Sequence, residues 1–120
     1  MARTVMTVQT TAASGTVLSA AAAVDGTNGN EFDNTSGRAM IEITNGSGSP
    51  ITATFITNGT YNVGSTAYPI ADLAVTVAAS STKACGPFDK TLFNSATSTV
   101  QVDWSSAASV TARVIALGAS

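Results

Sequence analysis

Charge is scarce in this sequence. Only 10% of the 120 residues are Asp, Glu, Lys or Arg, whereas about a quarter is usual for a soluble domain. Monomers generally keep a charged surface that discourages association, and β-proteins often protect their sheet edges with Lys or with inward-pointing charges. A β-rich chain with so few charges can form neither an extensively charged surface nor charged sheet edges. We therefore expect another protein subunit to cover its sheet edges, and composition favours assembly over catalysis.

Histidine is absent, and Cys85 is the single cysteine. An internal disulfide is excluded, and no His is present to activate a Ser or Cys nucleophile. Two carboxylates could form a glycosidase pair, but Glu42 and Asp103 fall on the predicted outer faces of strands, where a solvated charge is the ordinary role. The sequence has neither a Gly-rich phosphate loop nor zinc-ligand spacing. We predict that the protein is not an enzyme and needs no cofactor.

Nucleic acids and membranes are not expected as partners. The five basic residues are too scattered to neutralise a phosphate backbone: Arg3, Arg38, Lys83, Lys90 and Arg113. The longest run of small or apolar residues, 20–24, is far shorter than the roughly 20 residues that a transmembrane helix needs. The composition thus leaves other proteins as the expected partners.

Apolar and polar residues alternate with period two from residue 39 onward, which indicates strands with one buried face. Five windows show the pattern: residues 39–45, 51–57, 72–79, 98–104 and 110–117. The residues expected to point inward are Ala39, Ile41, Ile43, Ile51, Ala53, Phe55, Leu73, Val75, Val77, Val100, Val102, Trp104, Val110, Ala112 and Val114. Turn signals separate the windows. The predicted fold class is all-β, a single-domain antiparallel β-sandwich or small barrel.

The connections between these windows also carry local signals. The turn-forming segment NGSGSP joins the first two windows, so we expect residues 39–45 and 51–57 to form a β-hairpin with a loop longer than two residues. Residues 58–69 have the composition of a turn-rich connection. Asp89 is placed to cap one helical turn that holds Leu92 and Phe93. Phe88 follows the bend at Gly86-Pro87 and is expected to face either the core or a partner.

The first 38 residues are weakly patterned, and we interpret them as an N-terminal arm and loop attached to a sandwich core at 39–120. Residues 3–11 form either an extended arm or a strand of the chain's own sheet. We predict an extended arm that contacts another subunit by strand addition. The residues predicted to make intersubunit contacts are Arg3, Val5, Met6, Val8 and Gln9 of the arm, together with Pro87 and Phe88.

The loop from Asp25 to Asp33 is rich in side-chain oxygens, which are the ligands that Ca²⁺ prefers. The loop nevertheless fails the EF-hand template, because Asn30 stands at the sixth position in place of Gly and Ser36 at the twelfth in place of Glu. An ordinary solvated loop is therefore expected, with no metal.

Several short motifs follow one another in a recognisable order: MARTVMTVQT, VDGTNGNEFDN, GRAMIEITNGSGSPITATFIT, CGPFDKTLFN and STVQVDWSSAASVTARVIAL. This order resembles a family of small virion structural proteins of tailed bacteriophages. That family typically opens with MARTxLTxQT and has a DGxxFxN element, a GPF segment before an aromatic-Asn pair, and a closing V-x-V-D-x-S strand. The resemblance spans the whole chain. The departures are Asp89 and Lys90, where the family often has prolines, and longer segments at 27–30 and 61–69.

The resemblance implies a structural role in the phage head, as a capsid decoration (cement) protein that binds the major capsid protein shell and stabilises it. It implies self-association as a trimer or dimer, and a place on the capsid exterior after synthesis in the host cytoplasm. One alternative is a head–tail connector or tail-tube-like ring protein. Another is a carbohydrate-binding β-sandwich displayed on a surface, although one Trp, two Tyr and four Phe leave few residues for the aromatic platforms of such modules.

Overall fold

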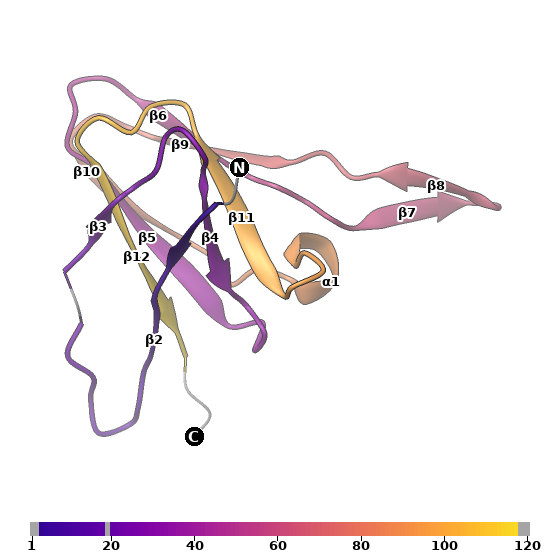
Figure 1. Ribbon diagram of the computed structural model, residues 1–120, viewed down its shortest axis with the longest axis horizontal. Helices are drawn as coiled ribbons and strands as arrows, with labels where there is room; N and C mark the ends of the chain where they lie inside the picture. The colour runs from indigo at the N-terminus through magenta and orange to yellow at the C-terminus, as the bar shows by residue number, and fades with distance from the viewer. Residues whose placement is uncertain (1–2, 19, 118–120) are drawn as a thin grey trace.

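The computed structural model describes residues 3–18 and 20–117, and two facing β-sheets make up most of it (Figure 1). The first sheet has the order β1 (Thr4–Met6), β4 (Asn30–Asp33), β11 (Thr99–Trp104), β6 (Ile51–Phe55) and β9 (Leu73–Val77). The second has the order β10 (Ser81–Cys85), β5 (Ala39–Asn45), β12 (Val110–Ala116) and β2 (Val8–Thr10), with β3 (Ala22–Ala23) also paired to β12. A separate hairpin consists of β7 (Thr60–Val63) and β8 (Thr66–Pro69), and α1 (Lys90–Phe93) is one helical turn. The predicted all-β sandwich is confirmed.

The core lies between the sheets and takes the alternate residues of the strands. Every second residue of β5, β6 and β12 is buried, as the period-two pattern predicts. The inward-facing residues of β11 are buried as well. Leu73 is the exception to the predicted core, since it is 44% exposed. It begins β9 at the rim of the first sheet, where no further strand covers its side chain.

β5 and β6 follow each other in the chain but belong to different sheets, so the predicted hairpin of 39–45 with 51–57 is wrong. The chain crosses between the sheets at Asn45, whose buried side chain donates to the carbonyl oxygens of Ser49 at 2.8 Å and Val77 at 3.1 Å. The same side chain accepts a hydrogen bond from the backbone N–H of Ser47 at 3.0 Å. These bonds fix the 46–50 loop in the conformation that carries the chain from one sheet to the other.

The N-terminal segment is part of the sandwich and does not extend away from it. β1 pairs in parallel with β4, and β2 pairs in parallel with β12, so the segment leaves one sheet and joins the other around Thr7. Of the two alternatives for residues 3–11, the structure shows a strand of the chain's own sheets, which corrects the predicted extended arm. The two sheets are consequently mixed, because each receives a parallel strand from this segment.

The sheet edges are partly closed by the chain itself. β1 and β2 form the edges on one side, and β9 and β10, joined by the turn at 78–80, form those on the other. Lys83 on edge strand β10 lies opposite Ile43 and therefore on the core-facing side, and its Nζ donates to the carbonyl oxygen of Thr76 on β9 at 2.9 Å. An inward-pointing Lys on an edge strand opposes edge-to-edge pairing. The chain thus uses one of its few charges for the protection that its composition made us expect from a partner.

Two further local predictions can be compared with the structure. Asp89 caps α1, accepting a hydrogen bond from the backbone N–H of Thr91 at 2.7 Å, and the turn holds Leu92 and Phe93 as predicted. No helix among the described residues has both the length and the apolar character required to cross a membrane.

Candidate functional site

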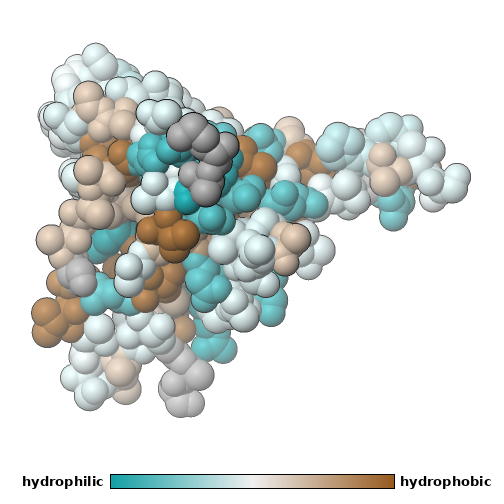
Figure 2. Space-filling model, in the orientation of Figure 1, coloured by the Kyte–Doolittle hydropathy of each residue, from teal (hydrophilic) through white to brown (hydrophobic). Residues whose placement is uncertain are grey.

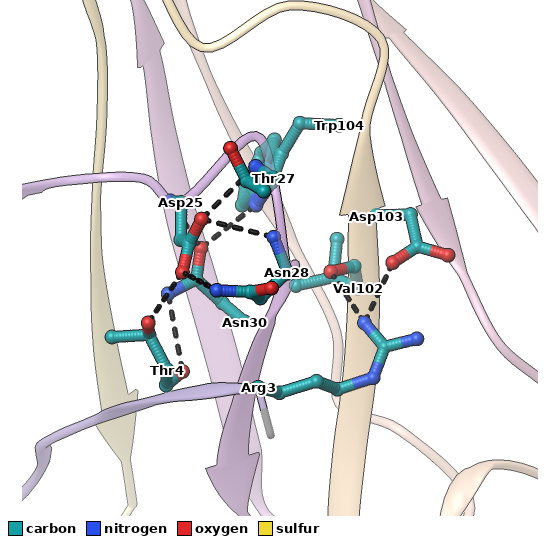
Figure 3. A network of polar contacts seen from close by, with 9 residues as sticks. All are labelled: Arg3, Thr4, Asp25, Thr27, Asn28, Asn30, Val102, Asp103 and Trp104. Atoms are coloured by element: carbon teal, nitrogen blue, oxygen red, sulfur yellow. Dashed lines mark hydrogen bonds and ion pairs between the residues drawn. The ribbon is translucent and has the colours of Figure 1, made fainter. Parts of the chain in front are cut away.

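A polar network ties the N-terminal strand to the body of the sandwich (Figure 3). The hydroxyl of Thr4 donates to Oδ2 of Asp25 at 2.6 Å, and the Nδ2 of Asn30 donates to the carbonyl oxygen of Thr4 at 3.2 Å. Asn30 Oδ1 in turn accepts from the backbone N–H of Asp25 at 2.9 Å and from the indole N–H of Trp104 at 2.8 Å. Strand β1 is therefore held within its own molecule at several points, and its backbone cannot leave the sheet without breaking this network.

Arg3 adds an ion pair to the same attachment. Its Nη1 lies 2.6 Å from Oδ1 of Asp103 and donates to the carbonyl oxygen of Val102 at 3.1 Å (Figure 3). The backbone of Gly29 passes beside this pair with a φ of +76°, and a Cβ there would collide with the Arg3 guanidinium and the Asp103 carboxylate. Arg3, predicted to contact another subunit, thus makes its charged contact within the chain.

Asp25 provides a pH-dependent part of this attachment. The hydrogen bonds from the Thr4 hydroxyl and from the backbone N–H of Asn28 lower the pKa of Asp25 from 3.8 to about 2. A carboxyl whose pKa is lower in the folded than in the unfolded state stabilises the fold above the unfolded pKa. This stabilisation is lost as the pH falls from about 4 towards about 2.

We therefore expect Asp25→Asn to lower the melting temperature at neutral pH and to flatten its decline between about pH 4 and pH 2. Thermal melts monitored by circular dichroism over this pH range measure both effects. Asp33→Asn removes a carboxylate of the same charge that makes no bond within this network, and it is the control for the loss of one negative charge. An Asp25→Asn protein with the wild-type pH profile would contradict the assignment.

The oxygen-rich loop does not gather its carboxylates around one point. Asp25 accepts from Thr4 and from its own turn, whereas Glu31 Oε2 accepts from the Thr99 hydroxyl at 2.8 Å. Asp33 Oδ1 accepts from the backbone and hydroxyl of Thr35. Among residues 3–18 and 20–117, no three or more Cys, Asp or Glu side chains are placed to hold a metal ion together.

The residues predicted to make intersubunit contacts divide into exposed and buried ones. Val5 is 69% exposed, Pro87 is exposed, and Val8 is half-buried against the core. Gln9 is half-buried and donates from Nε2 to the carbonyl oxygen of Val17 at 2.9 Å. Met6 lies in the core. Met6 is thus mainly a core residue, which corrects its prediction as an exposed arm contact, and its 8% exposed surface lies in the groove described below.

Phe88 is also corrected, because it occupies the centre of an aromatic cluster and is only 2% exposed. Its ring centroid lies 4.8 Å from that of Phe55, 5.2 Å from that of Phe93 and 5.8 Å from that of Phe32. Edge-to-face and tilted arrangements at such distances are favourable. Of the two alternatives predicted for Phe88, the core or a partner, the structure shows the core, because the chain bends inward after Gly86-Pro87.

The β7–β8 hairpin is the feature that sequence analysis missed. It stands clear of both sheets and projects from the sandwich (Figures 1 and 2). Its two-residue loop is Gly64-Ser65, and Gly64 has a φ of +63°, as the first position of a type II′ turn requires. A Gly-Ser pair between two segments of β-branched and aromatic residues is a hairpin signal. The segment at 61–69, longer here than in the family that the sequence resembles, includes most of this hairpin.

Hydrogen bonds anchor the hairpin to the body at its base. The backbone N–H groups of Asn58 and Gly59 donate to the carbonyl oxygen of Leu92 in α1, at 2.6 and 3.0 Å. On the other side of the base, the backbone N–H of Thr57 donates to Oδ1 of Asp72 at 2.9 Å. Beyond these bonds every described residue of β8 is exposed, and the segment 43–71 contains no charged residue.

An open groove lies on the other side of the sandwich, between the N-terminal segment and β3. Its volume is about 320 Å³. It is lined mainly by small or apolar side chains, among them Val5, Met6, Ala20, Ala22, Ala112 and Val114. Arg113 lies at the groove, and its Nη2 forms an ion pair with Oε1 of Glu42 at 3.0 Å. The segment 4–24, which forms most of this wall, contains no charged residue.

The residues that carry the family resemblance hold the fold together. Asn34 from the DGxxFxN element donates from Nδ2 to the carbonyl oxygen of Phe88 at 3.0 Å and to Oδ1 of Asn94 at 2.7 Å. Asn94 of the aromatic-Asn pair donates back to the carbonyl oxygen of Asn34 at 3.0 Å. Comparisons with protein-family models, with curated proteins and with solved structures gave no match.

Proposed function

We propose that this chain is a non-enzymatic structural subunit of a phage virion, a decoration protein that binds the assembled shell of major capsid protein and stabilises it. The observation that carries the proposal is the distribution of exposed apolar residues. Of the seven large apolar side chains exposed in the described part of the chain, five lie in the uncharged segments 4–24 and 43–71: Val5, Val17, Leu18, Val63 and Tyr68. Interface centres are depleted of charge and enriched in aromatic residues.

The resemblance of the motif order to small virion proteins selects the kind of assembly. Its residues are distributed over both sheets and the crossing loops, so the similarity concerns a whole domain and not a transferable catalytic site. A subunit that binds only the assembled shell stabilises that shell by mass action. The self-contained sandwich suits this role, because a decoration protein has to fold before the shell is available to it.

Binding to phage heads tests this proposal. The purified chain is mixed with heads that were assembled without it, and with unassembled major capsid protein as the control, and bound protein is measured by cosedimentation. We expect saturable binding to heads in numbers comparable to the capsid subunits, no binding to unassembled capsid protein, and a higher temperature of head disruption. Equal binding to unassembled protein, or none to heads, would overturn the proposal.

A connector or tail-tube-like ring protein is the second candidate, and the projecting hairpin is the observation that favours it. An element that reaches from one subunit onto the next produces head-to-tail contacts, which close into rings when the rotation permits. The same cosedimentation experiment separates the two candidates. A ring protein would occupy one vertex and bind in only a few copies per head.

A further inference from the structure

The β7–β8 hairpin is incomplete as a folding unit. Two-stranded hairpins are marginally stable in water, and three or more strands or a packed face are needed for independent stability. β7 and β8 pair with each other and with no other described strand. The hydrogen bonds that join the described residues of this segment to the body lie at its base, through Leu92, Phe93 and Asp72. The exposed outer part of the hairpin can therefore gain a packed face from another molecule.

One face of the hairpin is suited to such a surface. Residues that pair directly across antiparallel strands share a face, so Val63 and Thr66 lie on the same face, and Tyr68 joins them two positions along β8. Val63 is 61% exposed and Tyr68 is 42% exposed. Tyr is among the residues that most often dominate binding energy when they enter a pocket. This face therefore supplies an apolar and aromatic anchor.

The groove beside β3 has the complementary properties. Its volume of about 320 Å³ reaches the lower end of the range of protein binding pockets, about 300–1,000 Å³. Val5 at its rim is 69% exposed, and the loop that follows β2 exposes Val17 and Leu18 nearby in the chain. The groove wall at 4–24 and the hairpin segment at 43–71 carry no charge. The one charged side chain that lines the groove among the described residues, Arg113, is already paired with Glu42, so the two surfaces can meet without desolvating an unpaired ion.

We propose that the β7–β8 hairpin of one copy docks in the groove between β1, β2 and β3 of a second copy. The hairpin and the groove lie on opposite sides of the sandwich (Figure 1), so each copy can offer its hairpin to one neighbour and its groove to another. Such a contact joins different surfaces of the two copies and is therefore heterologous, which generates rings or open chains of subunits. This self-association goes beyond shell binding and does not depend on it.

The hairpin is too small to form the whole interface between two copies. A stable interface takes about 20–30 residues from each partner, and residues 58–71 provide fewer. The rest has to come from the body around the hairpin base on one copy, where Leu73 is exposed, and from the loop with Val17 and Leu18 on the other. The hairpin then acts as the central anchor and the surrounding surface as its rim.

Two variants that block opposite halves of the contact test this inference. Val63→Lys places a charge on the hairpin, and Val5→Lys places the same charge in the groove; both positions are exposed, so neither change should disturb the fold. Ala84→Lys is the control, because it adds the same charge at an exposed position of β10, on the far edge of the second sheet from β2. Masses are measured by native mass spectrometry and analytical ultracentrifugation on the full chain.

We expect the wild type and Ala84→Lys to form oligomers, and each of the two other variants alone to sediment as an 11.9 kDa monomer. An equal mixture of Val63→Lys and Val5→Lys should form a dimer and nothing larger, since one intact hairpin then meets one intact groove. A monomeric wild type overturns the inference, whether or not it binds heads. Assembly by either single variant also overturns it, and assembly by Val5→Lys alone would indicate a symmetric contact between two hairpins. A mixture that stays monomeric contradicts the pairing of one hairpin with one groove.

Discussion

Replacing Phe88 with alanine is expected to lower the free energy of unfolding by about 3–5 kcal/mol, the usual cost of truncating a buried aromatic residue. Phe88 contacts the rings of Phe32, Phe55 and Phe93. Phe32 and Phe55 belong to strands β4 and β6 of the first sheet, and Phe93 belongs to α1. Removing the Phe88 ring leaves a cavity that these rings cannot all close. Because domains of this kind are stable by only about 5–15 kcal/mol, the loss is a large part of the total. Urea or guanidinium unfolding followed by tryptophan fluorescence measures it.

Tyr68→Ala is the matched control for Phe88→Ala, because it removes an aromatic ring that is 42% exposed on the hairpin and lies outside the core. Its free energy of unfolding should change by less than about 1 kcal/mol, in keeping with surface substitutions. Phe88→Leu retains part of the packing and should fold even if the alanine variant does not. A loss below about 1 kcal/mol for Phe88→Ala would show that Phe88 is not a core residue and would restore its predicted role in contacting a partner.

Replacing Asn45 with alanine is expected to have the second-largest effect. The side chain is fully buried and bonds the carbonyl oxygens of Ser49 and Val77 as well as the backbone N–H of Ser47. Each buried polar group left without a partner costs about 1–3 kcal/mol. Of these partners the carbonyl oxygen of Val77 is in a buried bond, so we expect the free energy of unfolding to fall by about 1–3 kcal/mol, together with loosening of the crossing between β5 and β6. Chemical unfolding and amide hydrogen exchange of the 46–50 loop measure these effects.

Asn45→Asp tests whether the donor atoms are what matters. It keeps the size and the acceptor that Ser47 uses but places a carboxylate against the carbonyl oxygens of Ser49 and Val77, so it should be as damaging as Asn45→Ala. Asn62→Ala changes an exposed asparagine of β7 and should stay within about 0.5 kcal/mol of the wild type. If Asn45→Asp proved as stable as the wild type, the bonds from Nδ2 would not hold the crossing.

Local periodicity was sufficient to predict much of the core. The alternation in β5, β6, β11 and β12 identifies buried residues correctly, because a half-buried strand must expose one face and bury the other. Leu73 follows the same pattern and is nonetheless exposed. Periodicity predicts on which face of a strand a residue lies. It does not predict whether the end of the strand, where Leu73 lies, is covered by the opposite sheet.

Strand pairing could not be obtained in the same way. The NGSGSP segment has the composition of a hairpin turn, yet β5 and β6 lie in different sheets. The crossing is accompanied by long-range bonds from Asn45 to the carbonyl oxygens of Val77 in β9 and of Ala78, which no local pattern contains. The β7–β8 hairpin is a different case, since its Gly64-Ser65 turn is a local signal, although residues 58–69 were predicted only as a turn-rich connection.

The candidate site shows the same division. Scarcity of charge indicated association, and the structure leaves two exposed regions with little charge, the hairpin and the groove, where Arg113 is the only charged lining residue among those described. It also buries two of the predicted contact residues, Met6 and Phe88. Lys83 changes the argument about sheet edges, because a single inward-pointing amine protects one edge. Composition gives the number of charges, whereas their effect depends on where the fold places them.

By itself, then, the sequence determined the all-β class, the alternating core residues and the capped turn at Asp89, all of which depend on interactions between residues close together in the chain. The tertiary structure alone decided that the N-terminal segment adds a parallel edge strand to each sheet, that Phe88 lies inside an aromatic cluster and that the hairpin and the groove lie on opposite sides of the sandwich. These features depend on contacts between residues far apart in the chain. Such contacts are set by which strands pair and by the burial of side chains between two sheets, and neither is encoded in any single window of the sequence.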